Sequence, residues 1–286
     1  MANANFFRGR LIVGVFLLLG MLASCTESSF QDVVDDSRAT KIRGRIRLSD
    51  DASPDGVYIW LEGTNISTHT DRNGEFEVTL PAASQGLPNM ANGAYDLYYY
   101  LANYKFGTAR VALRNGQFLY GQGDISVNGE LIDARVMRKL LTINTVVDPS
   151  QVALSFRGAI NVHATLKAVL DSVTVVFPKV VGGLLGAIVL KNLSSGEVFV
   201  DVPDVGARTK AVEKVGPEAR TWSQVVLLTR TELPVGQYEV IPYFFIEQEN
   251  LPAALLVSLG VDVDEVNAAF AKIPAKRQGG RLVVTE

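Results

Sequence analysis

Cysteine and histidine are almost absent from this sequence: its 286 residues include one cysteine, Cys25, and two histidines, His69 and His163. A lone cysteine excludes an internal disulfide framework, so the folded part must rely on its hydrophobic core. The histidines lie far apart, and neither falls in a spacing typical of zinc ligands. The sequence also lacks the GxSxG and SxxK motifs of nucleophilic enzymes. We therefore predict a chain that is not an enzyme, with no catalytic residues, no metal and no cofactor.

Long blocks of like charge are missing as well. The chain has 27 Lys and Arg residues against 30 Asp and Glu residues, a formal net charge of −3. A slightly acidic chain without a basic cluster argues against nucleic acid as a partner. The acidic pairs Asp50-Asp51 and Asp262/Asp264 lie beside turns or a helix start, where solvation and capping account for them without a catalytic role.

An apolar run from Leu11 to Leu22 marks the N-terminus. It is too short to cross the hydrocarbon core of a bilayer, which requires about 20 apolar residues. Arg8 and Arg10 precede the run and Ala23-Ser24-Cys25 follows it. Basic residues, an apolar core and then small residues are the order of a secretory signal peptide.

The residues Leu22-Ala23-Ser24-Cys25 resemble the lipobox of bacterial lipoproteins. The resemblance implies that residues 1–24 are removed and that Cys25 carries acyl chains, each adding about 0.8 kcal/mol of membrane affinity per buried methylene. The alternative is a chance cysteine in an ordinary signal peptide. Thr26 and Glu27 lack the aspartate that the family links to inner-membrane retention, which favours the outer membrane. Whether the body faces the periplasm or the cell exterior stays open.

Residues 25–40 are expected to form a lipidated, flexible tether. After the cysteine, this stretch offers only Phe30 and two valines for burial, too little apolar surface to offset the entropy of ordering it. The mature chain would carry 25 basic and 30 acidic side chains, a formal charge of −5. Its membrane attachment would come from acyl chains.

A strand-rich domain is expected from residue 41. Over 41–48 apolar residues alternate with arginines, the period of a half-buried strand. Asn73-Gly74 is the residue pair that a tight hairpin favours, and Phe76, Val78 and Leu80 alternate after it. Further strands are expected at 57–61, 95–101, 108–113, 117–120 and 131–137. Many short strands separated by turns indicate a mostly β fold, a sandwich.

A family resemblance is carried by motifs in this region. They are Gly44-x-Ile46, Gly56-Val57, Leu61-x-Gly63-Thr64, Thr70-Asp71-x-Asn73-Gly74-x-Phe76, Pro81 and Gly93-x-Tyr95. This order resembles the carboxypeptidase regulatory-like domain and implies a non-catalytic, transthyretin-like β-sandwich over residues 41–140. The long 82–92 loop, and Ala102-Asn103-Tyr104 where the family often has Gly-Tyr, depart from the pattern. The family's modules are appended to metallocarboxypeptidases, outer-membrane receptors and surface lipoproteins.

Residues 141–286 are predicted to form a second β-rich, sandwich-like domain. Its clearest strands are expected at 152–156, 173–177, 187–190, 198–202, 225–228 and 238–246. Residues 233–238 contain a Pro and a Gly-x-Tyr that loosely match those of the first domain. The second domain is therefore either a repeat of the same fold or an unrelated sandwich. The apolar stretch 180–190 is too short to span a membrane and is interpreted as a buried strand with a glycine-rich bend.

A short helical pair is expected near 251–273. The first helix would run from Leu251 to Leu259, begin after Asn250 and end at Gly260. Asp262 with Glu265 three residues later would form a capping box for a second helix. Apolar side chains from both would pin the pair against the sandwich, namely Leu255, Leu259, Val266, Phe270 and Ile273. Residues 281–286 then read as a closing strand.

Two candidate sites remain. Asp71, Asn73 and Glu75 alternate oxygen ligands like the opening of a calcium loop, but the glycine is misplaced and we favour a turn. The aromatic residues Tyr58, Trp60, Tyr98 and Tyr100 would gather on one sheet surface, a candidate platform for a sugar or protein ligand. The alternative, which we favour, is burial of these rings against the second domain.

These observations lead to a non-catalytic envelope lipoprotein that acts as a binding or scaffolding module. One alternative is a carbohydrate- or peptide-binding surface protein that assists an outer-membrane transporter. The other is an envelope enzyme with a polar cleft between the two domains. Expected partners are the membrane, through Cys25, and an envelope protein or glycan.

Overall fold

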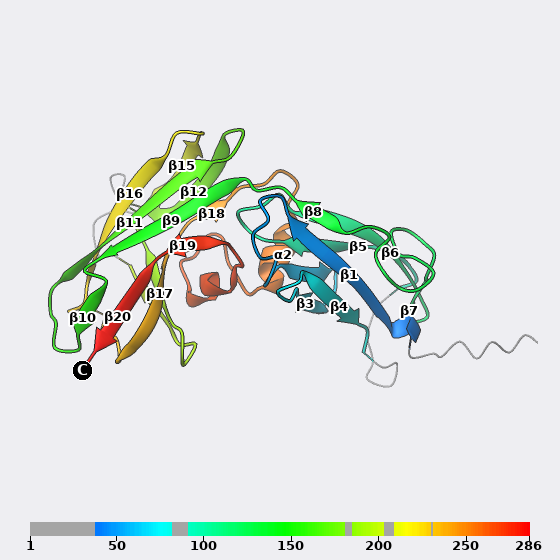
Figure 1. The fold of residues 1–286 in the computed structure, drawn as a ribbon, viewed down its shortest axis with the longest axis horizontal. Coiled ribbons are helices and arrows are strands. Elements are labelled where there is room, and N and C mark those ends of the chain that lie inside the picture. Colours follow the sequence, from blue (N-terminus) through cyan, green and yellow to red (C-terminus); the bar gives the residue numbers. More distant parts are fainter. Residues whose placement is uncertain (1–37, 82–90, 181–184, 203–208, 230) are drawn as a thin grey trace, which may run out of the picture. The chain divides into compact units, whose positions relative to one another are not determined.

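The computed structural model describes residues 38–81, 91–180, 185–202, 209–229 and 231–286 (Figure 1). Residues 39–286 form one unit, and strands dominate it, so the fold class is mostly β, as predicted. Cys25 and the rest of the expected signal peptide and tether up to residue 37 lie outside the described residues. In the part of the chain that is described, no helix has the length and apolarity required to cross a membrane.

The N-terminal half, residues 41–140, contains two sheets. A 3₁₀ turn, η1 (Arg38–Thr40), leads into it. The first sheet has the order β4-β1-β8 and the second the order β3-β2-β5-β6-β7. The strands are β1 (Lys41–Leu48), β2 (Tyr58–Leu61), β3 (Ser67–His69), β4 (Glu75–Thr79), β5 (Gly93–Tyr100), β6 (Gly107–Arg114), β7 (Gln117–Phe118) and β8 (Arg135–Met137).

These two sheets face each other across one apolar core, which makes the half a β-sandwich. Ile42 and Ile46 of β1 point inward with Phe76 of β4, and Ile59 and Leu97 of the second sheet meet them. The alternation along residues 41–48 is as predicted, because the arginines of β1 are exposed while the isoleucines are fully buried. The core thus follows from the period of two along each strand.

The Asn73-Gly74 turn differs from the expectation. β3 pairs with β2, and β4 pairs with β1, so the turn connects the two sheets and the predicted tight hairpin is wrong. Gly74 has the positive φ (80°) that was expected of it. A Cβ at Gly74 would lie 2.0 Å from the Ile46 carbonyl oxygen, so only glycine fits this close approach.

Charged side chains on the exposed side of the first sheet pair across strands. Glu77 of β4 accepts hydrogen bonds from Lys41 (2.8 Å) and Arg43 (2.9 Å) of β1. These bonds lower the pKa of Glu77 to about 2. The pairs are solvent-exposed, so they contribute little to stability. They do neutralise part of the basic charge on β1, that of Lys41 and Arg43.

The C-terminal half, residues 141–286, contains three sheets with the orders β10-β20-β17-β13-β14, β16-β11-β9-β19 and β15-β12-β18. The strands are β9 (Leu141–Asp148), β10 (Gln151–Ala153), β11 (Ala159–Ala168), β12 (Val173–Val180), β13 (Ile188–Asn192), β14 (Val198–Asp201), β15 (Thr209–Val215), β16 (Arg220–Leu227), β17 (Gly236–Pro242), β18 (Phe245–Ile246), β19 (Arg277–Gly279) and β20 (Arg281–Thr285).

A second apolar core fills this half. Inward side chains of β9, β11 and β16 meet those of β13, β17 and β20. The expected closing strand is β20, whereas the single strand expected at 238–246 is divided into β17 and β18. Leu185 and Ala187 are buried in front of β13, in agreement with the buried interpretation of this stretch. Residues 181–184 lie outside the described part.

The helical pair is shorter than predicted. The first helix is α2 (Ala253–Ser258), and the turn after it ends at Gly260, as expected. The second is the 3₁₀ helix η3 (Ala268–Lys272), capped by Asn267. The predicted capping box is wrong, because Asp262 accepts from the backbone N–H of Asp264 (2.9 Å) in a local turn. The predicted anchors Leu255, Leu259, Phe270 and Ile273 are buried, and Val266 packs against the same core.

Candidate functional site

The four aromatic residues of the expected platform are cross-strand neighbours. Tyr58 lies opposite Tyr100, and Trp60 lies opposite Tyr98, as the alternation along β2 and β5 predicts. All four side chains are buried, each with an exposed fraction of 8% or less. They belong to the apolar cluster of the C-terminal half rather than to the core of their own sandwich. The rings therefore do not form an exposed platform, and burial against the second half, the favoured alternative, is what the structure has.

The polar tips of Tyr58 and Trp60 are engaged within the protein. The Tyr58 hydroxyl is 3.0 Å from the Ser258 hydroxyl of α2, and the Trp60 indole N–H donates to the Thr64 carbonyl at 2.8 Å. Burial raises the pKa of the Tyr100 hydroxyl. The Tyr58–Ser258 contact crosses between the halves, and all four rings belong to the apolar cluster of the C-terminal half, so we assign them to joining the two halves.

The other residues considered as metal ligands each have their own partners within the protein. One carboxylate oxygen of Asp71 accepts hydrogen bonds from the backbone N–H groups of Asn73 (2.8 Å) and Glu75 (2.9 Å), so it stabilises the turn. The His69 ring packs against Tyr58 at 5.3 Å, and His163 Nδ1 lies 2.7 Å from the Ser223 hydroxyl. Within the described ranges, no three His, Cys, Asp or Glu residues gather in a group that fits a metal ion.

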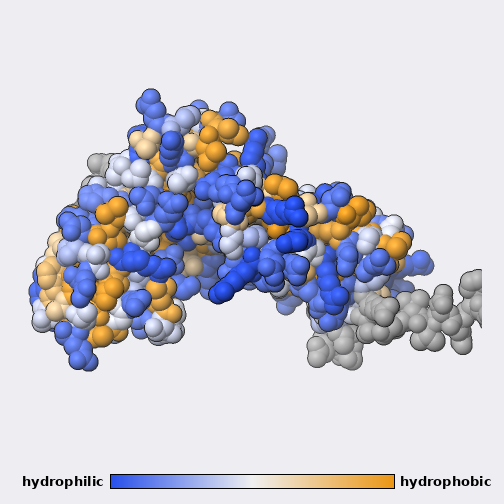
Figure 2. All heavy atoms as spheres, in the orientation of Figure 1, coloured by the Kyte–Doolittle hydropathy of each residue, from blue (hydrophilic) through white to orange (hydrophobic). Residues whose placement is uncertain are grey.

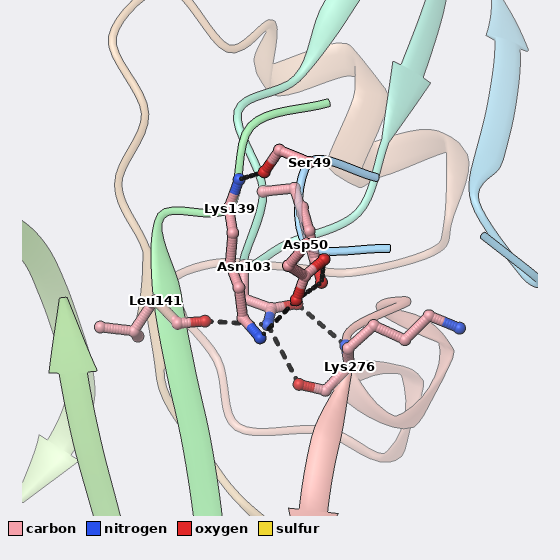
Figure 3. A network of polar contacts seen from close by, with 7 residues as sticks. Ser49, Asp50, Asn103, Lys139, Leu141 and Lys276 are labelled. Atoms are coloured by element: carbon pink, nitrogen blue, oxygen red, sulfur yellow. Dashed lines mark hydrogen bonds and ion pairs between the residues drawn. The ribbon is translucent and has the colours of Figure 1, made fainter. Parts of the chain in front are cut away.

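A polar network joins the two halves at the start of β9 (Figure 3). Asn103 is fully buried, and its amide NH₂ donates to the carbonyl oxygens of Leu141 and Lys276, both at 3.0 Å. Its amide oxygen accepts from the Lys276 N–H at 2.9 Å. One side chain thus satisfies three backbone groups of the C-terminal half, so the network fixes this connection in a single geometry.

A neighbouring ion pair fixes the loop before β9. Asp50 accepts hydrogen bonds from the Tyr104 hydroxyl (2.9 Å) and the Lys139 ammonium (2.8 Å). Partial burial of Asp50 favours its neutral form, but the hydrogen bonds from Lys139 and Tyr104 outweigh it and lower the pKa of the carboxyl. Asp50 therefore has a structural partner and is not a free catalytic carboxylate.

The space between the halves at this junction is too small for a substrate. A cavity lined by Tyr100, Ile143, Phe244 and Arg277, among others, measures about 10 Å³. That volume suits about one water molecule.

A second concave site, which we call the groove, lies beside α2. Its volume is about 660 Å³, within the range of roughly 300–1,000 Å³ typical of ligand sites. Val176 of β12 and Phe245 of β18 are register partners and line it from the sheet side. Leu256 and Val257 of α2 line it from the helix side. The complete lining consists of residues 176, 210, 245–248, 251, 253, 256, 257 and 260–263.

The lining is mostly apolar and carries charge at its margins. Val257 is 69% exposed and Val263 39% exposed, although both are aliphatic. Figure 2 shows apolar side chains elsewhere scattered among hydrophilic ones, which is ordinary for a protein surface. Glu247 and Asp262 line the groove with carboxylates, and Lys210 is its one lining ammonium group. The Glu247 carboxylate makes no hydrogen bond or ion pair with a described residue.

The edge strand β18 favours an extended ligand in the groove. In the antiparallel pairing of β18 with β12, Phe245 directs its backbone groups toward β12, and Ile246 directs its own away from it. Ile246 is 6% exposed, and β18 is the edge strand of its sheet, so its N–H and C=O point to the side on which a further strand would add. Gln248 also lines the groove, and two hydrogen bonds hold its side chain in place. Its amide oxygen accepts from the Phe106 N–H (2.9 Å), and its NH₂ donates to the Tyr104 carbonyl (2.9 Å).

Sequence reasoning missed the groove. Its walls come from residues 176, 210 and 245–263, which are adjacent only after folding. The local signal that existed was two exposed valines: Val263 lies in the segment between α2 and η3, and Val257 lies on the outer side of α2. A helix that buries one apolar stripe does not require apolar residues there.

The comparisons with known proteins reach only distant structures. No family model and no curated protein matches the chain. A cohesin–X-dockerin complex of Acetivibrio cellulolyticus matches at 22% identity over 35% of this chain and 58% of that chain, with a TM-score of 0.23. The major pilin subunit BcpA of Bacillus cereus matches at 12% identity over 72% and 66%, with a TM-score of 0.24.

The Bacillus anthracis TIE protein matches at 9% identity over 86% of this chain and 33% of that chain, with a TM-score of 0.22. The chain thus spans less than two thirds of the length of each of these three structures. Likenesses this distant do not assign a function to the chain.

Proposed function

We propose that this chain is a non-catalytic, lipid-anchored protein of the bacterial cell envelope whose groove beside α2 binds an apolar segment of a partner protein. The observation that carries the proposal is the groove itself, a mostly apolar site of about 660 Å³ with two carboxylates on its lining. The lipobox-like residues 22–25 support the anchor, and the occupied junction between the halves supports a role without catalysis.

The chemistry of the groove selects the ligand. Exposed aliphatic side chains such as Val257 lose unfavourable contact with water when a partner covers them. Glu247 and Asp262 outnumber Lys210 on the lining, so a partner with basic residues beside its apolar ones is complementary in charge. The N–H and C=O of Ile246 point away from β12, toward the side on which an extended segment would pair with this edge strand. The occupant is therefore a short extended peptide segment with apolar and basic residues.

The first test measures binding of a defined peptide. The probe is a labelled ten-residue peptide with an apolar centre and lysines at both ends, added to the purified full-length chain in detergent and followed by fluorescence anisotropy. A peptide with glutamates at its ends should bind at least about tenfold more weakly, a difference of about 1.4 kcal/mol, because its charges repel the carboxylates of Glu247 and Asp262. Equal affinity for both peptides would contradict the proposal.

Two variants locate the binding. Val257→Asp places a carboxylate on the apolar wall and should weaken the lysine-ended peptide's binding about tenfold or more, whereas Val136→Asp on β8, at a similarly exposed valine (64%), should not change it. The double variant Glu247→Lys/Asp262→Lys should reverse the preference between the two peptides. Binding that survives both changes would place the peptide elsewhere and refute the groove as its site.

A separate test concerns the anchor. The full chain expressed in a bacterium and fed an alkyne-tagged fatty acid should become labelled, and Cys25→Ser should abolish the label. The matched control Cys25→Ser/Ser28→Cys keeps one thiol nearby but moves it away from Leu22-Ala23-Ser24, and it should stay unlabelled. A chain that retains its first 24 residues and an unmodified Cys25 would disprove the lipid anchor, whatever the result for the groove.

A further inference from the structure

The outward side of β9, β11 and β16, which we call the charge-poor face, is distinct from the groove. Of the outward side chains of these three strands, only Asp148 and Lys167 are charged, and both are exposed. Depletion of charge is the compositional mark of the centre of protein–protein interfaces. Val146 and Val225 stand on the same face with exposed fractions of 51% and 47%, so covering it would remove aliphatic surface from water.

Hydroxyl and imidazole groups on this face already bond to one another. The His163 Nδ1 to Ser223 Oγ distance is 2.7 Å, and the hydroxyls of Thr165 and Thr221 are 2.8 Å apart. Both pairs link β11 to β16 directly across the ladder. A partner that covers them does not leave these hydroxyls without a hydrogen bond, which lowers the cost of removing water.

The two charges stand at opposite ends of the face. Asp148 of β9 lies opposite Asn161 of β11, and Lys167 lies opposite Thr142 of β9. These positions are six residues apart along β11, about 20 Å along a strand. A two-fold axis across the strands at Ala164, midway between them, would place the Asp148 end of one copy against the Lys167 end of the other, twice per pair. Self-complementarity of this kind is what a symmetric dimer interface requires.

From this arrangement we infer that the charge-poor face binds a second copy of the same chain in an antiparallel, face-to-face dimer. The flat area of three strands of this length is about 400 Å² by the usual strand spacings, below the roughly 800 Å² per partner of a standard interface. The dimer is therefore expected to be weak. Two-dimensional concentration of anchored copies would favour it.

The experiment uses the full chain in cells, with two differently tagged copies expressed together. A carbodiimide, which joins a carboxylate to an amine without a spacer, should produce a cross-linked pair that both tags recover. Asp148→Lys or Lys167→Asp, each present in both copies, should lower the yield about tenfold. Co-expressing one copy with Asp148→Lys and one with Lys167→Asp restores both ion pairs and should return the yield to that of the unaltered chain.

Other outcomes decide against the inference. Absence of a cross-linked pair from the unaltered chain, or a yield that neither single reversal lowers, would overturn it. The inference would also be overturned if the mixed pair does not recover the cross-linking yield of the unaltered chain. The double variant Asp148→Lys/Lys167→Asp must fold normally by circular dichroism for this outcome to count. Val136→Lys on β8 serves as the matched surface control and should leave the yield unchanged.

Discussion

Asn103→Asp is expected to lower the free energy of unfolding by about 3–5 kcal/mol, the cost typical of an uncompensated buried charge. The Asn103 NH₂ donates to the carbonyl oxygens of Leu141 and Lys276, each at 3.0 Å. An aspartate would direct a carboxylate oxygen at these two oxygens and could donate to neither. Since Asn103 is fully buried, no water can enter to separate the groups without opening the junction between the halves.

Chemical denaturation measures the effect, and pH supplies a check on its cause. The buried carboxyl of the variant would have its pKa raised above the unfolded value of about 3.9. The loss of stability should therefore be small below about pH 4 and grow as pH rises, because the unfolded state then releases the proton more readily. The exposed Asn128→Asp serves as control and should change stability by about 0.5 kcal/mol or less. A loss independent of pH would point to a packing defect.

Trp60→Ala is expected to lower the free energy of unfolding by about 3–5 kcal/mol, as large-to-small changes in a core do. The Trp60 side chain is 3% exposed and packs beside Tyr98, with ring centroids 5.8 Å apart. Because these rings belong to the core of the C-terminal half, the cavity left by the change would lie where the two halves meet. The surface change Val136→Ala should cost about 0.5 kcal/mol or less.

This variant separates the two roles considered for the aromatic cluster. Thermal and urea unfolding should show the large loss, and a glycan array should show no difference that is not explained by unfolding. A Trp60→Ala protein that keeps full stability but loses a glycan bound by the unaltered chain would establish the ligand platform and refute the interface role.

The groove and the charge-poor face lay beyond the reach of the sequence for different reasons. The groove is lined by residues 176, 210 and 245–263. No local pattern in any one of these segments indicates that the others will lie beside it. The face depends on β11, which sequence reasoning missed. Its inward residues alternate correctly, but two of the five, Ala164 and Ala168, are alanines, so the apolar signal of the strand is weak.

Two predictions from short motifs, the capping box and the tight hairpin, were wrong for a similar reason: each motif was present, but it did not fix the element built around it. The Asp262 to Glu265 spacing fits a capping box, yet the 3₁₀ helix begins after Asn267, whose side chain accepts a hydrogen bond from the Ala269 N–H. The Asn73-Gly74 pair specified a turn with a positive φ at Gly74. It did not specify whether the strands on either side would pair with each other or with β2 and β1.

By itself the sequence determined what acts within a few residues: the period of two that sends Ile59 to one side of β2 and Trp60 to the other, the glycine turns, and the signal-like N-terminus. Only the tertiary structure decided what covers each side, because burial depends on which distant segment arrives there. Trp60 became core and Val257 remained exposed although both are apolar. The hydrophobic effect is non-directional, so the topology of the chain decides which segment covers each apolar side chain.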